Sequence, residues 1–137
     1  MSVFAIIDTN VLVSAMMKPQ SVPGQVVKES LNGQIIPVVN WEIMDEYKKV
    51  LRRLKFGFDP RDVSVLLKEL EKRAVYCDAS TIEDLMPDPK DIVFYAVTME
   101  KRQDQEAYLV TGNIKHFPEK PFVVTPREML AILTEGK

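Results

Sequence analysis

A run of five apolar residues near the N-terminus, Val3-Phe4-Ala5-Ile6-Ile7, ends abruptly at Asp8. The run is too short for a buried helix and shows no polar alternation, so it predicts a strand buried on both faces. A carboxylate directly after such a strand would lie at the carboxyl edge of a sheet, where open α/β folds bind their ligands. Asp8 could equally cap the helix that follows, and the residue type alone does not decide between the two.

Strand-like and helix-like segments alternate along the rest of the chain, which favours one α/β domain over residues 1–137 with a mostly parallel sheet. Pro37 inside the second apolar run predicts a strand end or an irregular edge. A capping box at Thr125 and Glu128 marks the start of the last helix. We expect strands over 35–39, 75–77, 107–110 and 122–124, and helices over 10–16, 23–32, 41–56, 92–97 and 126–133, with one more helix after residue 59.

The charge balance restricts how this chain could bind nucleic acid. Its 18 basic and 20 acidic residues give a net charge of −2, so the protein as a whole is not a basic nucleic-acid binder and would need a local patch. Basic side chains cluster in the third predicted helix, where they form either such a patch or a solvated face. They are Lys48, Lys49, Arg52, Arg53 and Lys55.

Two further features concern location. No apolar run approaches the length of a membrane span, so we expect no membrane partner. The single cysteine, Cys77, allows no internal disulfide and favours a reducing compartment, the cytoplasm.

Oxygen-bearing side chains fall at the ends of several predicted elements or at a helix edge. Hard divalent cations bind carboxylate and amide oxygens. Carboxylates brought together would raise one another's pKa unless a cation lay between them, so a fold that gathers these residues indicates a metal site. The candidates are Asp8, Glu46, Asp88, Asp91 and Asn113.

Each candidate also has a purely structural alternative. Asp88 can be a helix N-cap, Glu46 can pair with Lys49 one turn on, and Asn113 can be a turn residue in a left-handed conformation. His116, the single histidine, is more typical of a structural or surface position than of a catalytic one. The sequence contains no cysteine–histidine cluster for zinc, no glycine-rich phosphate loop and no nucleophile elbow.

The ordered set of motifs resembles a known family. Ile6-Ile7-Asp8-Thr9-Asn10-Val11-Leu12-Val13-Ser14-Ala15 resembles the opening of a PIN domain. The resemblance continues through Glu46, Asp88-Pro89-Lys90-Asp91 and Leu109-Val110-Thr111-Gly112-Asn113, and so covers essentially the whole chain. The ending Val123-Val124-Thr125-Pro126-Arg127-Glu128-Met129-Leu130 is similar to the subset of the family described as toxin components.

This resemblance implies a three-layer αβα fold around a parallel five-stranded sheet, with the first strand central and the fourth beside it. It implies a ribonuclease that uses Mg²⁺ or Mn²⁺, usually the toxin paired with an antitoxin protein and often self-associating as a dimer. The family's acids carry over as Asp8, Glu46 and Asp91. Its fourth acidic position is Asn113 here, which weakens any second metal site unless Asp88 supplies the missing charge.

The mechanism that follows is hydrolysis of single-stranded RNA, in which a bound ion activates water for in-line attack. Asp8, Glu46 and Asp91 would hold the ion, and Asn113 would orient water. Hydroxyl and amide donors beside the carboxylates would fix their orientation. These donors are Thr9, Asn10 and Thr111, and the expected phosphate contacts are Lys48, Lys49, Arg52 and Arg53.

Two other functions remain open from the sequence. A haloacid-dehalogenase-type phosphatase also has an aspartate after its first strand, but it needs a second aspartate where this chain has Asn10. A catalytically weak domain that binds RNA or a protein is favoured by Asn113, which contributes no negative charge.

Overall fold

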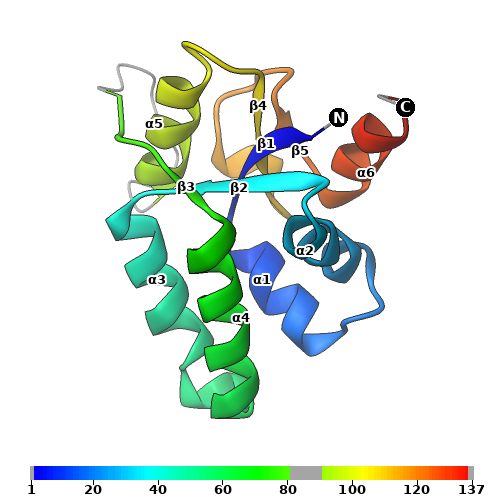
Figure 1. The fold of residues 1–137 in the computed structure, drawn as a ribbon, viewed down its shortest axis with the longest axis vertical. Coiled ribbons are helices and arrows are strands. Elements are labelled where there is room, and N and C mark those ends of the chain that lie inside the picture. The colour runs from blue at the N-terminus through cyan, green and yellow to red at the C-terminus, as the bar shows by residue number, and fades with distance from the viewer. Residues whose placement is uncertain (1, 81–90, 136–137) are drawn as a thin grey trace.

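Five parallel strands form one sheet in the order β3-β2-β1-β4-β5 (Figure 1). The computed structural model describes residues 2–80 and 91–135. The first strand is central because it pairs with β2 on one side and β4 on the other, as expected for this fold. The strands are β1 (Val3–Ile7), β2 (Ile35–Val39), β3 (Val75–Tyr76), β4 (Ala107–Val110) and β5 (Val123–Val124).

Helices lie on both faces of the sheet, which gives the expected three-layer αβα architecture (Figure 1). Helix α5 packs against β1 and β4, whereas α2 packs against β2 and also contacts α1, α4 and α6. None of the helices in the described part of the chain has the length and apolar character needed to cross a membrane. The helices are α1 (Thr9–Met17), α2 (Val22–Asn32), α3 (Trp41–Leu51), α4 (Pro60–Arg73), α5 (Ile92–Lys101) and α6 (Pro126–Glu135), with short 3₁₀ turns η1 (Leu54–Phe56) and η3 (Ile114–His116).

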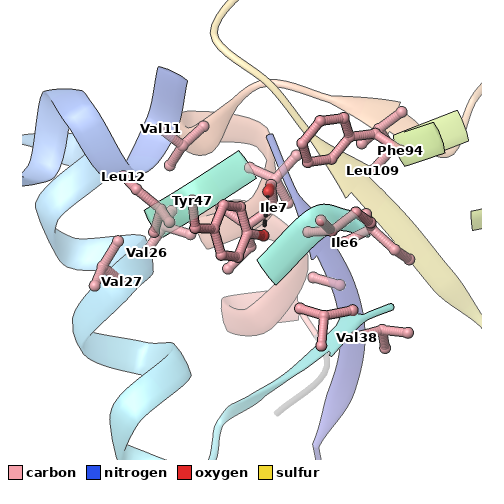
Figure 2. Packing of buried hydrophobic residues seen from close by; sticks show 14 of the residues in the cluster. Ile6, Ile7, Val11, Leu12, Val26, Val27, Val38, Tyr47, Phe94 and Leu109 are labelled. Carbon is pink, nitrogen blue, oxygen red and sulfur yellow. Dashed lines mark hydrogen bonds between the residues drawn. The ribbon is translucent and has the colours of Figure 1, made fainter. Parts of the chain in front are cut away.

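The core is built around β1, which is buried on both faces as its unbroken apolar sequence predicts. Ile6 and Ile7 are at most 1% exposed and pack among side chains from both helical layers (Figure 2). The buried Tyr47 of α3 donates its hydroxyl hydrogen bond to the carbonyl oxygen of Ile7 at 2.5 Å (Figure 2). This bond ties α3 to the last residue of β1 and so fixes the helix beside Asp8.

Local capping signals explain where several helices begin and end. Asn40 accepts a hydrogen bond from the backbone N–H of Ile43 at 2.8 Å and thereby starts α3. Thr125 and Glu128 exchange side-chain and backbone bonds at 2.9 and 3.2 Å, which confirms the capping box of α6. Gly33 ends α2 at a φ of +92°, a conformation that few other residues adopt without strain.

The third helix is shorter than its apolar pattern predicts. It ends at Leu51 rather than residue 56, because Arg53 is extended and the chain then makes the separate 3₁₀ turn η1. Leu54, which we expected on the buried stripe, is 98% exposed. Since α4 packs back against α3, the residues between them must form the reversal, which ends in Gly57 at a φ of +64°.

Pro37 does not mark an edge of the sheet, because β2 lies between β1 and β3. Pro37 is opposite Ala5 of β1, and the pairing with β3 begins only at Val38. The missing N–H therefore falls where the strand changes from one neighbour to the other, and an interior strand can tolerate it there. The expectation of a strand end or irregular edge is thus wrong.

Two leucines in the same stretch test the revised end of α3. Leu51 is 1% exposed and Leu54 is 98% exposed. Leu51→Ala should lower the free energy of unfolding by about 2–5 kcal/mol because it opens a cavity in the core. Leu54→Ala should change it by less than about 0.5 kcal/mol. Urea unfolding of both variants measures the difference, and equal losses would contradict a helix that ends at Leu51.

Candidate functional site

The sheet brings Asp8 and Thr111 together at its carboxyl edge. From β1 the chain goes on to β2, whereas β4 lies on the opposite side of β1, so the β1–β4 boundary is the topological switch point. The N–H of Asp8 donates to the carbonyl of Val110 at 2.8 Å, which extends the strand pairing into the site. The Thr111 hydroxyl then donates to Oδ2 of Asp8 at 2.8 Å.

The carboxylate of Asp8 makes no capping bond to α1, so the capping alternative is wrong. Besides Thr111, Nδ2 of Asn10 donates to Asp8 Oδ2 at 3.2 Å. The other end of the Asn10 amide accepts the N–H of Gly112 at 3.0 Å. A Cβ at position 112 would lie 3.3 Å from that amide oxygen, so glycine allows this close approach of the β4 loop to α1.

Glu46 is directed toward the start of α1 from the partly buried edge of α3. The buried Thr9 hydroxyl donates a hydrogen bond to Oε2 of Glu46. The alternative pairing with Lys49 does not form, because Lys49 instead pairs with Asp45 at 2.8 Å on the exposed side of the helix. Within residues 2–80 and 91–135, no lysine or arginine pairs with Glu46 or Asp8.

Burial and mutual repulsion set the electrostatics of the site. Asp8 is 6% exposed, and this burial is the main cause that raises its pKa from 3.8 to about 6. The Thr111 hydrogen bond opposes the shift, while the negative charges of Asp91 and Glu46 raise the pKa further. Of the three carboxylates that the resemblance assigns to the site, Glu46 and Asp91 therefore each lie near enough to Asp8 to repel it.

Tyr47 is buried next to Asp8 and Glu46, and its hydroxyl group stays protonated. Burial raises the pKa of Tyr47 well above 10, and the charges of Asp8 and Glu46 raise it further. Tyr47 therefore remains a hydrogen-bond donor to the backbone of β1 throughout the ordinary pH range.

Asp91 immediately precedes α5 rather than lying inside its first turn, and its side chain makes no capping bond to that helix. Its Oδ2 lies 3.3 Å from Nδ1 of His116. Asp88 falls outside the described residues, so neither its expected capping role nor its expected metal-binding role is placed.

Asn113 begins the turn η3 with a φ of −142°, so the expected left-handed turn conformation is wrong. Its backbone N–H donates to Oγ1 of Thr111 at 3.0 Å, and its Nδ2 lies 2.9 Å from Nε2 of His116. Sequence reasoning set His116 aside as a lone surface histidine. Its spacing from Asn113 was a signal that could have identified it. In a tight turn, side chains three positions apart lie on the same side of the turn, so His116 is expected next to Asn113.

The carboxylate and amide oxygens of these residues suit a hard divalent cation that keeps some of its coordinated water molecules. The negative charges of Glu46 and Asp91 both act on the Asp8 carboxylate, and a cation beside Asp8 would relieve this repulsion. Over the described ranges 2–80 and 91–135, no three acidic, histidine or cysteine side chains are close enough to enclose a metal ion. Mg²⁺ commonly binds through one or two carboxylates and several waters, so an open arrangement of acids fits it.

A cleft of about 680 Å³ runs between α3 and α5 and includes Glu46 in its lining. Lys49 and Arg53 line the same cleft, which we call the α3–α5 cleft. Of the other two expected phosphate contacts, Lys48 pairs with Glu71 of α4 at 2.9 Å and Arg52 is an exposed residue at the end of α3. The structure thus brings Lys49 and Arg53, but not Lys48 or Arg52, to the cleft that Glu46 lines.

Comparison with known proteins gives one match. A family profile described as PIN domain matches residues 5–115, which include Asp8, Glu46, Asp91 and Asn113. The curated proteins and the solved structures contain no match to this chain.

The raised pKa of Asp8 predicts a pH-dependent cost to stability. Because the folded-state pKa of about 6 exceeds the ordinary 3.8, folding favours the protonated carboxyl, and this stabilisation is lost as the pH rises from about 4 through 6. Asp8→Asn in metal-free protein should therefore be more stable than wild type by up to about 3 kcal/mol at pH 7–8, and by almost nothing at pH 4.

Urea unfolding at several pH values in the presence of a chelator measures this difference. Asp45→Asn is the matched control, since Asp45 is exposed and its loss removes only a surface ion pair. An equal gain at pH 4 and pH 8 would show that ionisation of Asp8 is not the cause.

Proposed function

We propose that this chain, which belongs to the PIN-domain family, is a metal-dependent endoribonuclease that hydrolyses phosphodiester bonds of single-stranded RNA. PIN domains are in general nucleases, so hydrolysis of nucleic acid is the expected class of reaction. The observation that carries the proposal is the buried Asp8 carboxylate at the switch point of the sheet, held by Thr111 and Asn10, with the charges of Glu46 and Asp91 near enough to act on it.

These three carboxylates would hold Mg²⁺ or Mn²⁺, directly or through water, with Asp88 as a further donor from outside the described residues. When bound, the ion supplies an activated water and neutralises charge on the phosphate. At neutral pH, Asp8, whose pKa is about 6, is mostly ionised and available to a cation.

The surrounding residues keep the carboxylates in place. Thr111 and Asn10 both donate to Oδ2 of Asp8, so the orientation of that carboxylate is fixed. Thr9 similarly fixes Oε2 of Glu46. Such donors limit rotation of the acids and thereby lower the reorganisation needed when the substrate binds. The Asn113 amide would orient a water molecule without adding charge.

The α3–α5 cleft supports RNA as the substrate. Glu46 lines it together with Lys49 and Arg53, so a strand whose scissile phosphate reached the acids could place a neighbouring phosphate near these cations. A single strand fits this arrangement better than a duplex, since the cut strand must enter a concave acidic site. As the toxin of a toxin–antitoxin pair, the protein would be inhibited by an antitoxin segment that brings an arginine or lysine to the acids.

One observation favours a second function, namely RNA or protein binding with little catalysis. Asn113 replaces a carboxylate of the family pattern and so lowers the charge that can hold a second ion. The phosphatase alternative has no comparable support, because Asn10 is engaged as a hydrogen-bonding partner of Asp8 and Gly112 and the chain matches the PIN-domain family.

Cleavage of a single-stranded RNA with Mn²⁺ tests the proposed reaction. Asp8→Asn and Glu46→Gln should each lower the cleavage rate by on the order of 100-fold, because each removes a charged metal ligand. Glu69→Gln is the matched control: it lies on α4 outside the cleft lining and loses the same charge, so its rate should stay near wild type. Cleavage at the wild-type rate by Asp8→Asn, or RNA binding without cleavage at every Mn²⁺ concentration, would contradict the nuclease.

Arg53 tests the path of the RNA through the cleft. Arg53→Ala should weaken binding to all single-stranded sequences similarly and reduce the salt dependence of binding by about one phosphate contact. Binding is measured in the Asp8→Asn background, which keeps the RNA intact. The control is Lys68→Ala on the exposed face of α4, which removes the same charge far from the cleft lining. An equal effect of both variants would indicate general attraction rather than a defined path.

A further inference from the structure

A continuous series of contacts joins Asp8 to Asp91 through His116, a residue to which the proposed function gives no role. Asp8 accepts from the Thr111 hydroxyl, and that hydroxyl oxygen accepts the N–H of Asn113. The series continues from Asn113 Nδ2 to Nε2 of His116 at 2.9 Å, and from His116 Nδ1 to Oδ2 of Asp91 at 3.3 Å. The two nitrogens of one ring thus contact two of the predicted site residues.

The backbone holds His116 in this position. The turn η3 begins after Asn113, and the N–H of His116 donates to the Asn113 carbonyl at 3.1 Å. The His116 side chain is 47% exposed, whereas the Asp91 side chain is 16% exposed. Because the ring lies at the rim of the site rather than in the core, replacing it leaves no buried cavity, and its contacts matter mainly to the site.

The chemistry of the contacts is complementary. An amide nitrogen only donates, so in this arrangement Nδ2 of Asn113 points its N–H toward Nε2 of His116. The ring therefore turns the amide nitrogen of Asn113 toward itself and leaves the amide oxygen as the atom that can face water or an ion. The other ring nitrogen, Nδ1, lies within ion-pair distance of the Asp91 carboxylate, at 3.3 Å from Oδ2.

We propose that His116 is a positioning residue that holds the Asn113 amide and the Asp91 carboxylate in the orientation that cleavage requires. This inference rests on the proposed function, since it assigns both partners to the metal-dependent site. It gives the chain a side-chain connection between η3 and the start of α5 at the place where the family pattern has a further acid.

Substitution of His116 tests the role with three measurements on the full chain. These are Mn²⁺ affinity without RNA, from the electron paramagnetic resonance signal of free Mn²⁺; kcat and KM on a single-stranded RNA oligonucleotide; and the melting temperature. His116→Ala should lower Mn²⁺ affinity and kcat by roughly 10-fold or more, with KM and melting temperature near wild type. His116→Gln, whose amide both donates and accepts, should recover part of both losses, and Lys115→Ala in the same turn should resemble wild type.

The outcomes separate this inference from the proposed function. Wild-type Mn²⁺ affinity and kcat in His116→Ala would overturn the positioning role while leaving the nuclease intact. The positioning role would also be overturned if His116→Ala lowers the melting temperature enough to explain its lost activity and His116→Gln restores neither. If wild-type protein binds Mn²⁺ but cleaves no RNA, the nuclease is wrong, and a weaker Mn²⁺ affinity of His116→Ala still supports the positioning of Asp91.

Discussion

The double burial of β1 is the constraint on which the rest of the structure depends. This strand pairs with β2 and β4 and is covered on both faces, so the residue that follows it is also drawn out of water. The raised pKa of Asp8 corresponds to about 3 kcal/mol of destabilisation at neutral pH. Apolar burial around Ile6 and Ile7 must offset this cost. The buried carboxylate of Asp8 therefore lowers the stability of the fold, and the hydrophobic core compensates for it.

The sequence predicted the sheet well because its signals are local. Apolar runs without alternation identify strands covered on both faces, and β2 and β4 have the bounds that their runs predict. The end of α3 could not be predicted in this way, because Leu54 continues the helical spacing of Leu51. The chain instead leaves the helix after Leu51, becomes extended at Arg53 and reverses so that α4 packs against α3, an arrangement that the local apolar spacing does not indicate.

The same distinction applies to the site. Asp8 and Thr111 could be selected because both directly follow apolar strands, and parallel strands end at one edge of a sheet. The bond from Thr9 to Glu46 and the contact of His116 with Asp91 depend on how α1 meets α3 and how η3 meets α5. No spacing within the sequence indicates these contacts between distant elements, so the contact of His116 with Asp91 could not be predicted before the fold is known.

Asn113 changes the electrostatics of the site rather than only removing a ligand. The repulsion that raises the pKa of Asp8 comes from Asp91 and Glu46, and a carboxylate at position 113 would add to it. With an amide there, Asp8 stays ionised at neutral pH before any cation arrives. The Asn113 amide nitrogen can also donate a hydrogen bond, and it contacts the same histidine ring that lies beside Asp91, so the residue that replaces the acid is connected to another candidate site residue.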